Sequence, residues 1–148
     1  MSKATQRQIV ATITPVNQTG HSTGPSFGAA RYFSTVSGGE ISASVEKVYD
    51  GGSLFPQTLC APAEIGDITL TMFYDPDEDG EELSKLRQLV GQVYYDVSVF
   101  TLDCDLKVPD TERVYAKALL VGLTEPDGDA SSGAPAQFSL TFSASTVV

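Results

Sequence analysis

Apolar and small polar residues alternate strictly along three well-separated segments of the chain. These segments are Glu40–Val48, Asp67–Tyr74 and Gln137–Ser145. A period of two places successive side chains on opposite faces of a β-strand, so each segment predicts a strand with one apolar and one polar face. Runs rich in β-branched and aromatic residues predict four more strands. They are Arg7–Thr14, Arg31–Val36, Val93–Leu102 and Arg113–Leu123.

One segment, Gly80–Val90, has helical periodicity and is followed by Gly91, a residue at which helices commonly end. Its apolar face is formed by Leu83, Leu86, Leu89 and Val90. Glu81 precedes Lys85 by four residues, which is the favourable order for an ion pair on a helix. The whole pattern predicts a mainly β fold, a β-sandwich or barrel with one flanking α-helix.

The segment Asp75–Leu86 opens with the pattern D-x-D-x-D-G, the first half of a calcium-binding EF-hand loop. Such a loop needs a bidentate glutamate at its twelfth position, which here is Leu86. We therefore interpret the segment as the acidic start of a surface helix, where carboxylates interact favourably with the helix dipole. We expect no metal site; a looser calcium site from Asp75, Asp77 and Asp79 ranks second.

The chain of 148 residues is long enough for one domain with its own core, and its apolar fraction of 41% is near the globular average. No apolar run approaches the ~20 residues that a membrane-spanning helix needs. Met1–Val10 lacks the apolar centre of a signal peptide. We predict a single domain, residues 1–148, with no membrane partner. Cys60 and Cys104 are expected to be free, partly buried thiols of a reducing cytoplasm.

The formal net charge is −10, from 19 acidic and 9 basic residues. Tight nucleic-acid binding places cations on phosphates, and docking on anionic lipid also needs cations, so both functions are disfavoured. The charge is compatible with a protein that lets DNA pass without holding it, because an acidic surface repels phosphate over ~8 Å at physiological salt.

Candidate catalytic groups are few. His21 lies in the polar segment Asn17–Ala30, and no Cys-x-x-Cys pair is present for zinc. The acid pairs Asp103/Asp105 and Asp127/Asp129 lie where turns and solvated loops are expected. Gly38-Gly39 is interpreted as a hairpin turn. We therefore expect no enzymatic activity and no cofactor.

Several short motifs follow one another from Ser37 to the C-terminus. The strand SGGEISASVEKV runs into the loop YDGG, and the strand DITLTMFY runs into an Asp-rich turn. One helix ending in Val-Gly follows, then the strand end LLVGLTEP, an Asp/Ser/Gly loop and a terminal Ser/Thr strand. In this order the motifs resemble the tail tube (major tail) protein of long-tailed bacteriophages.

This resemblance implies a β-sandwich with a flanking helix, related in fold to the tubes of contractile phage tails and type VI secretion. It implies homo-hexameric rings that stack into a hollow tube, the strands of each subunit joining edge to edge into an inner barrel. The implied partners are a tape-measure protein, a tail terminator and tail-tip or baseplate proteins, with DNA as passing cargo during infection. The implied location is the virion tail, with assembly in the host cytoplasm.

The strand patterns agree with this resemblance. Pairing exposed sheet edges between subunits removes an aggregation hazard, and short polar side chains give a passing polymer little to bind. Candidate lumen-facing residues are Glu40, Ser42, Ser44, Glu46, Asp67, Thr69 and Thr71. We expect the segments 15–30 and 49–66 to be inter-subunit arms that connect one ring to the next.

Other functions fit the pattern less well. The alternative from another class is a calcium-dependent β-sandwich binding module for carbohydrate, although the chain has no tryptophan for stacking on sugars. A small hydrolase with a carboxylate pair ranks last. A tail terminator or a contractile-tail tube would share the expected fold, so the sequence separates these two poorly from a tail tube.

Overall fold

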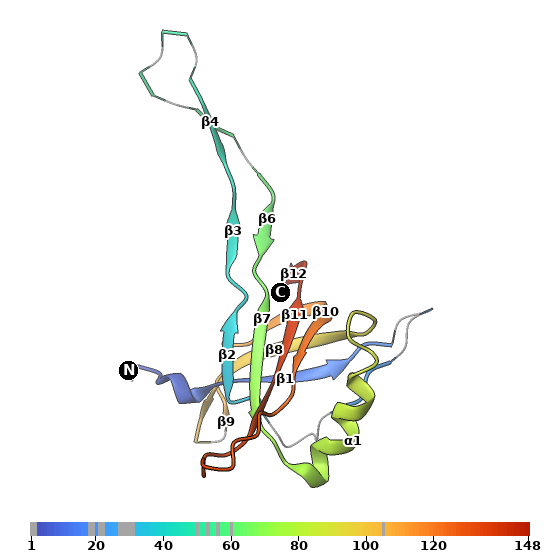
Figure 1. Cartoon of the computed structure of the whole chain (residues 1–148). Coiled ribbons are helices and arrows are strands. Elements are labelled where there is room, and N and C mark those ends of the chain that lie inside the picture. Colours follow the sequence, from blue (N-terminus) through green and yellow to red (C-terminus); the bar gives the residue numbers. More distant parts are fainter. Residues whose placement is uncertain are drawn as a thin grey trace.

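The computed structural model describes residues 3–17, 20, 23–26, 32–49, 51–52, 54–55, 57–59, 61–104 and 106–148. It shows a strongly curled antiparallel sheet, one helix packed beside it, and a long two-stranded arm that projects from one end (Figure 1). The fold is mainly β with one α-helix, as the sequence predicted.

The curled sheet has the strand order β1-β8-β10-β11-β7-β2, with every neighbouring pair antiparallel. The strands are β1 (Ile9–Pro15), β2 (Thr35–Gly38), β7 (Ile68–Phe73), β8 (Tyr94–Asp103), β10 (Arg113–Thr124) and β11 (Gln137–Ser143). A single bridge between Ala11 and Phe33 brings the two ends of the sheet together. The sheet is therefore a barrel whose closure, between β1 and β2, rests on one residue pair.

Three short elements complete the barrel. They are a 3₁₀ turn, η1 (Gln6–Gln8), the strand β9 (Leu106–Lys107) on β8, and the strand β12 (Thr146–Val147) on β10. The sequence did not predict them. It also placed the strand now called β2 too early, because Phe33 makes only the isolated bridge and the strand continues through Gly38.

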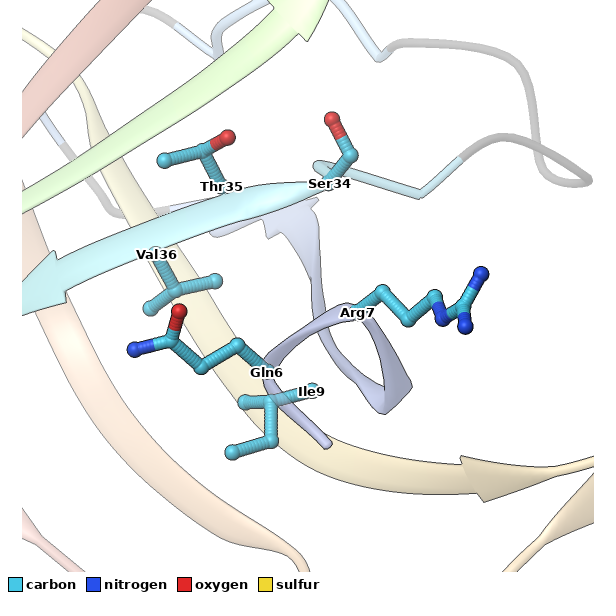
Figure 2. A pocket seen from close by; sticks show the side chains of 6 residues that line it. All are labelled: Gln6, Arg7, Ile9, Ser34, Thr35 and Val36. Atoms are coloured by element: carbon cyan, nitrogen blue, oxygen red, sulfur yellow. The ribbon is translucent and has the colours of Figure 1, made fainter. Parts of the chain in front are cut away.

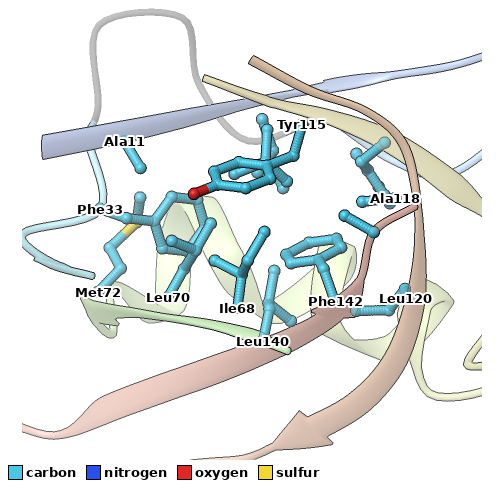
Figure 3. Packing of buried hydrophobic residues seen from close by; sticks show 14 of the residues in the cluster. Ala11, Phe33, Ile68, Leu70, Met72, Tyr115, Ala118, Leu120, Leu140 and Phe142 are labelled. Carbon is cyan, nitrogen blue, oxygen red and sulfur yellow. The ribbon is translucent and has the colours of Figure 1, made fainter. Parts of the chain in front are cut away.

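The core occupies the inside of the barrel (Figure 3). On β11, Phe138, Leu140 and Phe142 are fully buried while the residues between them are not, so the predicted alternation is confirmed. Ile68 and Leu70 of β7 face the same interior. Burying side chains of this size contributes about 1.5–3 kcal/mol each, which makes the barrel the stable part of the molecule.

The helix α1 spans Pro76–Leu86 and buries Leu83 and Leu86. It begins earlier and ends earlier than the predicted Gly80–Val90, because Asp75 caps its first turn and Pro76 fits the first helical position. Leu89 and Val90 pack on the core from the turns that follow the helix. Within the described part of the chain, no helix is long and apolar enough to cross a membrane.

The arm continues directly from β2 and returns into β7. It consists of the pair β3 (Ile41–Ala43) with β6 (Ala63–Ile65), followed by the pair β4 (Glu46–Val48) with β5 (Gln57–Leu59). The sequence predicted no strand in Tyr49–Gly66, but this segment supplies both returning strands, β5 and β6. The period of two in Glu40–Val48 does form strands, but their described side chains are exposed on both faces.

Candidate functional site: the arm, its root and a polar sheet face

The root of the arm is built from glycines. Gly38 and Gly39 have φ values of +82° and +74°, a left-handed conformation that side chains with a Cβ rarely adopt. A Cβ on Gly38 would collide with the carbonyl oxygen of Asp67, and one on Gly39 would lie 2.7 Å from the hydroxyl oxygen of Tyr115. These glycines were interpreted as a hairpin turn, which is wrong: the chain passes through them from β2 into β3 in one direction.

Tyr115 fixes this root from inside the barrel. Its side chain is 2% exposed, and its hydroxyl donates a hydrogen bond of 3.0 Å to the carbonyl oxygen of Gly39. The same hydroxyl oxygen accepts a bond of 3.1 Å from Nε of Arg113. The backbone adds bonds from Gly39 N to Asp67 O (3.2 Å) and from Gly66 N to Glu40 O (2.8 Å). The direction of the arm is thus set by contacts with the core.

Replacing Tyr115 by phenylalanine is expected to lower the free energy of unfolding by about 1–3 kcal/mol, because a buried carbonyl oxygen loses its donor while ring packing is kept. Urea unfolding measures this. Faster amide exchange around Gly39 and Gly66 should accompany the loss. Tyr32→Phe is the control, since Tyr32 is exposed and should change stability by less than about 0.5 kcal/mol. Equal effects of the two substitutions would contradict the role of Tyr115.

The arm exposes apolar side chains far from the core. In the β3–β6 pair, Ile41 lies opposite Ile65 and Ala43 opposite Ala63, so one face of the ribbon is apolar. Ile41 is 58% exposed, and at the tip Leu54 and Phe55 are 89% and 80% exposed. The other large apolar residues exposed on the arm are Val45, Val48, Tyr49 and Leu59. An isolated two-stranded ribbon is at best marginally stable in water, and a contiguous apolar surface marks an interaction site.

The side chains on the outer face of the barrel are short and polar along β7 and β11. Thr69 and Thr71 lie between the core residues of β7, and Thr71 Oγ1 lies 3.0 Å from Ser139 Oγ of β11. Thr141 pairs with Thr69 in the same sheet. The predicted lumen residues are thus divided between two places. Thr69 and Thr71 line this sheet face, whereas Glu40, Ser42, Ser44 and Asp67 are exposed on the arm or at its root, and Glu46 lies in β4, its side chain outside the described residues.

The acidic segment caps the helix. The Oδ1 atom of Asp75 accepts a bond of 3.1 Å from the backbone N–H of Asp77, and Oδ2 of buried Asp79 accepts one of 2.9 Å from the backbone N–H of Asp75. Glu81 and Lys85 form the predicted ion pair at 3.3 Å. Two of the three candidate calcium ligands therefore serve the first helical turn. Among the described residues, no group of three His, Cys, Asp or Glu side chains is placed to hold a metal ion.

The other candidate groups are dispersed. Asp129 accepts bonds from the backbone N–H and hydroxyl of Ser131, which lower its pKa; this is the turn chemistry that was expected of the Asp127/Asp129 loop. Cys104 is a free thiol, but it is exposed rather than partly buried as predicted. His21, Cys60 and Asp105 lie outside the described residues.

Part of the segment 15–30, predicted as an arm, lies against the barrel. The hydroxyl of Tyr95, a residue buried in β8, donates a bond of 2.7 Å to the carbonyl oxygen of Pro25. Gly24 is buried beside it, and a Cβ there would collide with the Tyr95 ring. The Tyr95 ring also meets Phe142 edge to face at 5.7 Å. The glycine is thus needed for the chain to cross this ring.

Burial, and to a smaller extent the charge of Glu82, raises the pKa of Tyr95 above its ordinary value of 10.0. A raised folded-state pKa means that stability is fully present below pH 10 and is lost as pH rises from there toward the folded pKa. Tyr95→Phe should therefore cost about 1 kcal/mol at pH 7, from the lost hydrogen bond. It should also reduce the loss of stability between pH 9 and pH 11, as urea unfolding at both values would measure. An unchanged alkaline loss would contradict this assignment.

Comparison with solved structures shows which proteins share this fold. The chain aligns over its full length with 96% of a chain from the sheath/tube terminator of an extracellular contractile injection system, PVC, with a TM-score of 0.73 and 20% identity. It aligns over 96% of its length with 87% of a chain from the PVC sheath-tube complex, with a TM-score of 0.69 and 20% identity. It also aligns over its full length with 91% of a chain from the tube terminating cap of the anti-feeding prophage, with a TM-score of 0.71 and 17% identity.

The chain therefore shares its fold with chains from contractile injection systems. No protein-family model matches the sequence, and no curated protein matches it. The fold that the resemblance to tail tubes implied thus agrees with the observed fold. The sequence motifs had suggested the tail tube of long-tailed phages in particular. The similar structures belong instead to contractile injection systems.

Proposed function

We propose that the protein is a structural subunit whose copies form hexameric rings, and that these rings stack into the hollow tube of a phage tail or a related injection apparatus. The observation that carries the proposal is the arm. Among the described residues of the arm, seven large apolar ones between Ile41 and Leu59 are exposed, and the arm projects from a well-packed barrel. Such a surface needs a partner, and the shared fold supports another subunit of the same tube as that partner.

The polar face of β7 and β11 is the surface that we assign to the lumen. Its threonine and serine hydroxyls are short and uncharged, and Thr71 and Ser139 are already hydrogen-bonded to one another. A wall of this kind offers few groups for a polyanion to bind. The excess of acidic residues over basic ones adds long-range repulsion of phosphate. Both properties suit a conduit for DNA that does not hold its cargo.

The solved structures with this fold include chains from tube ends as well as from a tube. They come from a sheath/tube terminator, a baseplate and a terminating cap. We propose that the protein meets a tail terminator at one end of its tube and baseplate or tip proteins at the other, around a tape-measure protein. The finished tube belongs to the virion tail, and assembly takes place in the host cytoplasm.

Negative-stain electron microscopy of the purified full chain tests the tube directly. Hollow tubes or stacks of six-fold rings are the expected result, and sedimentation should show assembly that increases with protein concentration. A protein that stays monomeric at every concentration, including after addition of a purified baseplate fraction, would refute the proposal. A rise in melting temperature on adding calcium would favour the carbohydrate-binding module instead.

A further inference from the structure

A groove opens where the barrel is closed by a single residue pair. It is lined by Gln6 and Arg7 of η1, Ile9 of β1, and Ser34, Thr35 and Val36 at the start of β2. Figure 2 shows Val36 pointing toward Gln6 and Ile9, whereas the Arg7 side chain extends away from Val36; Arg7 is exposed. Within the described part of the chain, β2 pairs on one side with β7, and its other edge makes no ladder after the Phe33 bridge. The groove thus combines an apolar floor with an open strand edge.

The groove lies in the basic part of an otherwise acidic chain. The first acidic residue of the sequence is Glu40, and the residues before it include Lys3, Arg7 and Arg31. Lys3 and Arg7 are exposed, and neither has a hydrogen bond or ion pair in the described structure. A partner segment that binds in this groove should therefore carry a negative charge.

The arm has the three properties that the groove calls for. The β3–β6 ribbon has free strand edges, because each of its strands pairs with the other alone among the described residues. One of its faces carries Ile41 and Ile65, and the opposite side of the ladder pairs Ser42 with the exposed acid Glu64. The open edges, apolar side chains and negative charge of the arm thus match the open edge, apolar floor and positive charge of the groove.

The direction of the arm makes this match possible between stacked copies. The groove lies at the start of β2, and the arm leaves from the end of β2 (Figure 1). At ~3.3 Å per residue, the outgoing branch from Glu40 to Tyr49 spans about 30 Å, close to the length of the ten-residue barrel strand β8. A second copy displaced along β2 therefore presents its groove to the arm of the first.

We propose that the groove formed by Gln6, Arg7, Ile9 and Ser34–Val36 receives the β3–β6 arm of a second copy, with strand pairing along β2 and Arg7 beside Glu64. The proposal rests on the proposed function, since it names the site at which one ring receives the arm of the next. Addition of a strand to an open sheet edge gives affinity through the backbone, and the side chains set the register.

Disulfide trapping tests the contact in assembled protein. In a chain with Cys60→Ser and Cys104→Ser, the pair Ser34→Cys and Ser42→Cys should give a ladder of multimers on oxidation. The control pair Ser34→Cys and Ser131→Cys, the latter in the loop after β10, should stay monomeric on the same gel. Normal tubes by microscopy without a ladder would overturn this inference and leave the tube itself standing. Absence of tubes from the unmodified chain would instead refute the proposed function.

Charge reversal tests the ionic part independently. Arg7→Glu should reduce tube formation at least tenfold at low salt, and Glu64→Lys in the same chain should restore it. Lys117→Glu makes the same change of charge on an exposed residue of β10 and should assemble normally. Normal assembly of Arg7→Glu, failure of Glu64→Lys to restore it, or an equal loss in Lys117→Glu would each overturn the pairing.

Discussion

Phe142→Ala is expected to lower the free energy of unfolding by about 3–5 kcal/mol, which is a large part of the 5–15 kcal/mol that holds a typical domain together. The Phe142 side chain is fully buried in the barrel, where it meets the ring of Tyr95. Its removal leaves a cavity among β-strands that are fixed by ladders on both sides, so the surroundings can collapse only partly. Urea unfolding of the subunit under conditions that prevent assembly measures the loss.

Phe55→Ala is the matched control, because it deletes the same side chain at the tip of the arm. Phe55 is 80% exposed in the single chain, so the free energy of unfolding should change by less than about 0.5 kcal/mol. Tube formation, in contrast, should be weakened by Phe55→Ala at concentrations where the unchanged chain assembles. If Phe55→Ala destabilised the isolated subunit as much as Phe142→Ala, the arm would belong to the core of its own chain.

The two phenylalanines also show how far the sequence could predict the fold. Phe138, Leu140 and Phe142 alternate with small polar residues, and so do Ile41, Ala43 and Val45. Both patterns correctly predict strands, since a period of two is a property of the local backbone. Burial depends on what lies above each strand face. The first set faces the barrel interior, whereas Ile41 and Val45 of the second set are exposed on a ribbon that projects away from the barrel.

The root of the arm was missed for a related reason. A Gly-Gly pair has the same sequence signature whether it closes a two-residue turn or allows a kink within a strand pair. Here the glycines are needed because atoms of Asp67 and Tyr115 occupy the space where a Cβ would lie. Both residues are distant in sequence, so no local pattern reveals this contact. Likewise, the groove near Arg7 depends on Ser34–Val36 lying beside η1, a contact that no local pattern encodes. The only signal in the sequence was the absence of acidic residues before Glu40.

Shortening the arm is expected to abolish tube formation while leaving a folded barrel. Glu40 and Gly66 are joined by a backbone hydrogen bond of 2.8 Å, so an Asn-Gly turn can connect them directly in place of Ile41–Ile65. The deleted residues include none of the fully buried core, and the bond from Tyr115 to Gly39 is kept. The free energy of unfolding should therefore change by less than about 1 kcal/mol. Circular dichroism and urea unfolding check the barrel, and microscopy checks for tubes.

A second variant separates the length of the arm from its chemistry. Ile41→Ser, Leu54→Ser and Phe55→Ser together keep the full ribbon but remove three of its exposed apolar side chains. We expect this chain to form no tubes either, because burial of these side chains against another copy supplies the favourable free energy of stacking. Tubes of normal appearance from the shortened chain would show that the rings stack through the barrel alone. Tubes from the serine variant alone would show that the arm acts through its backbone edges and its charges.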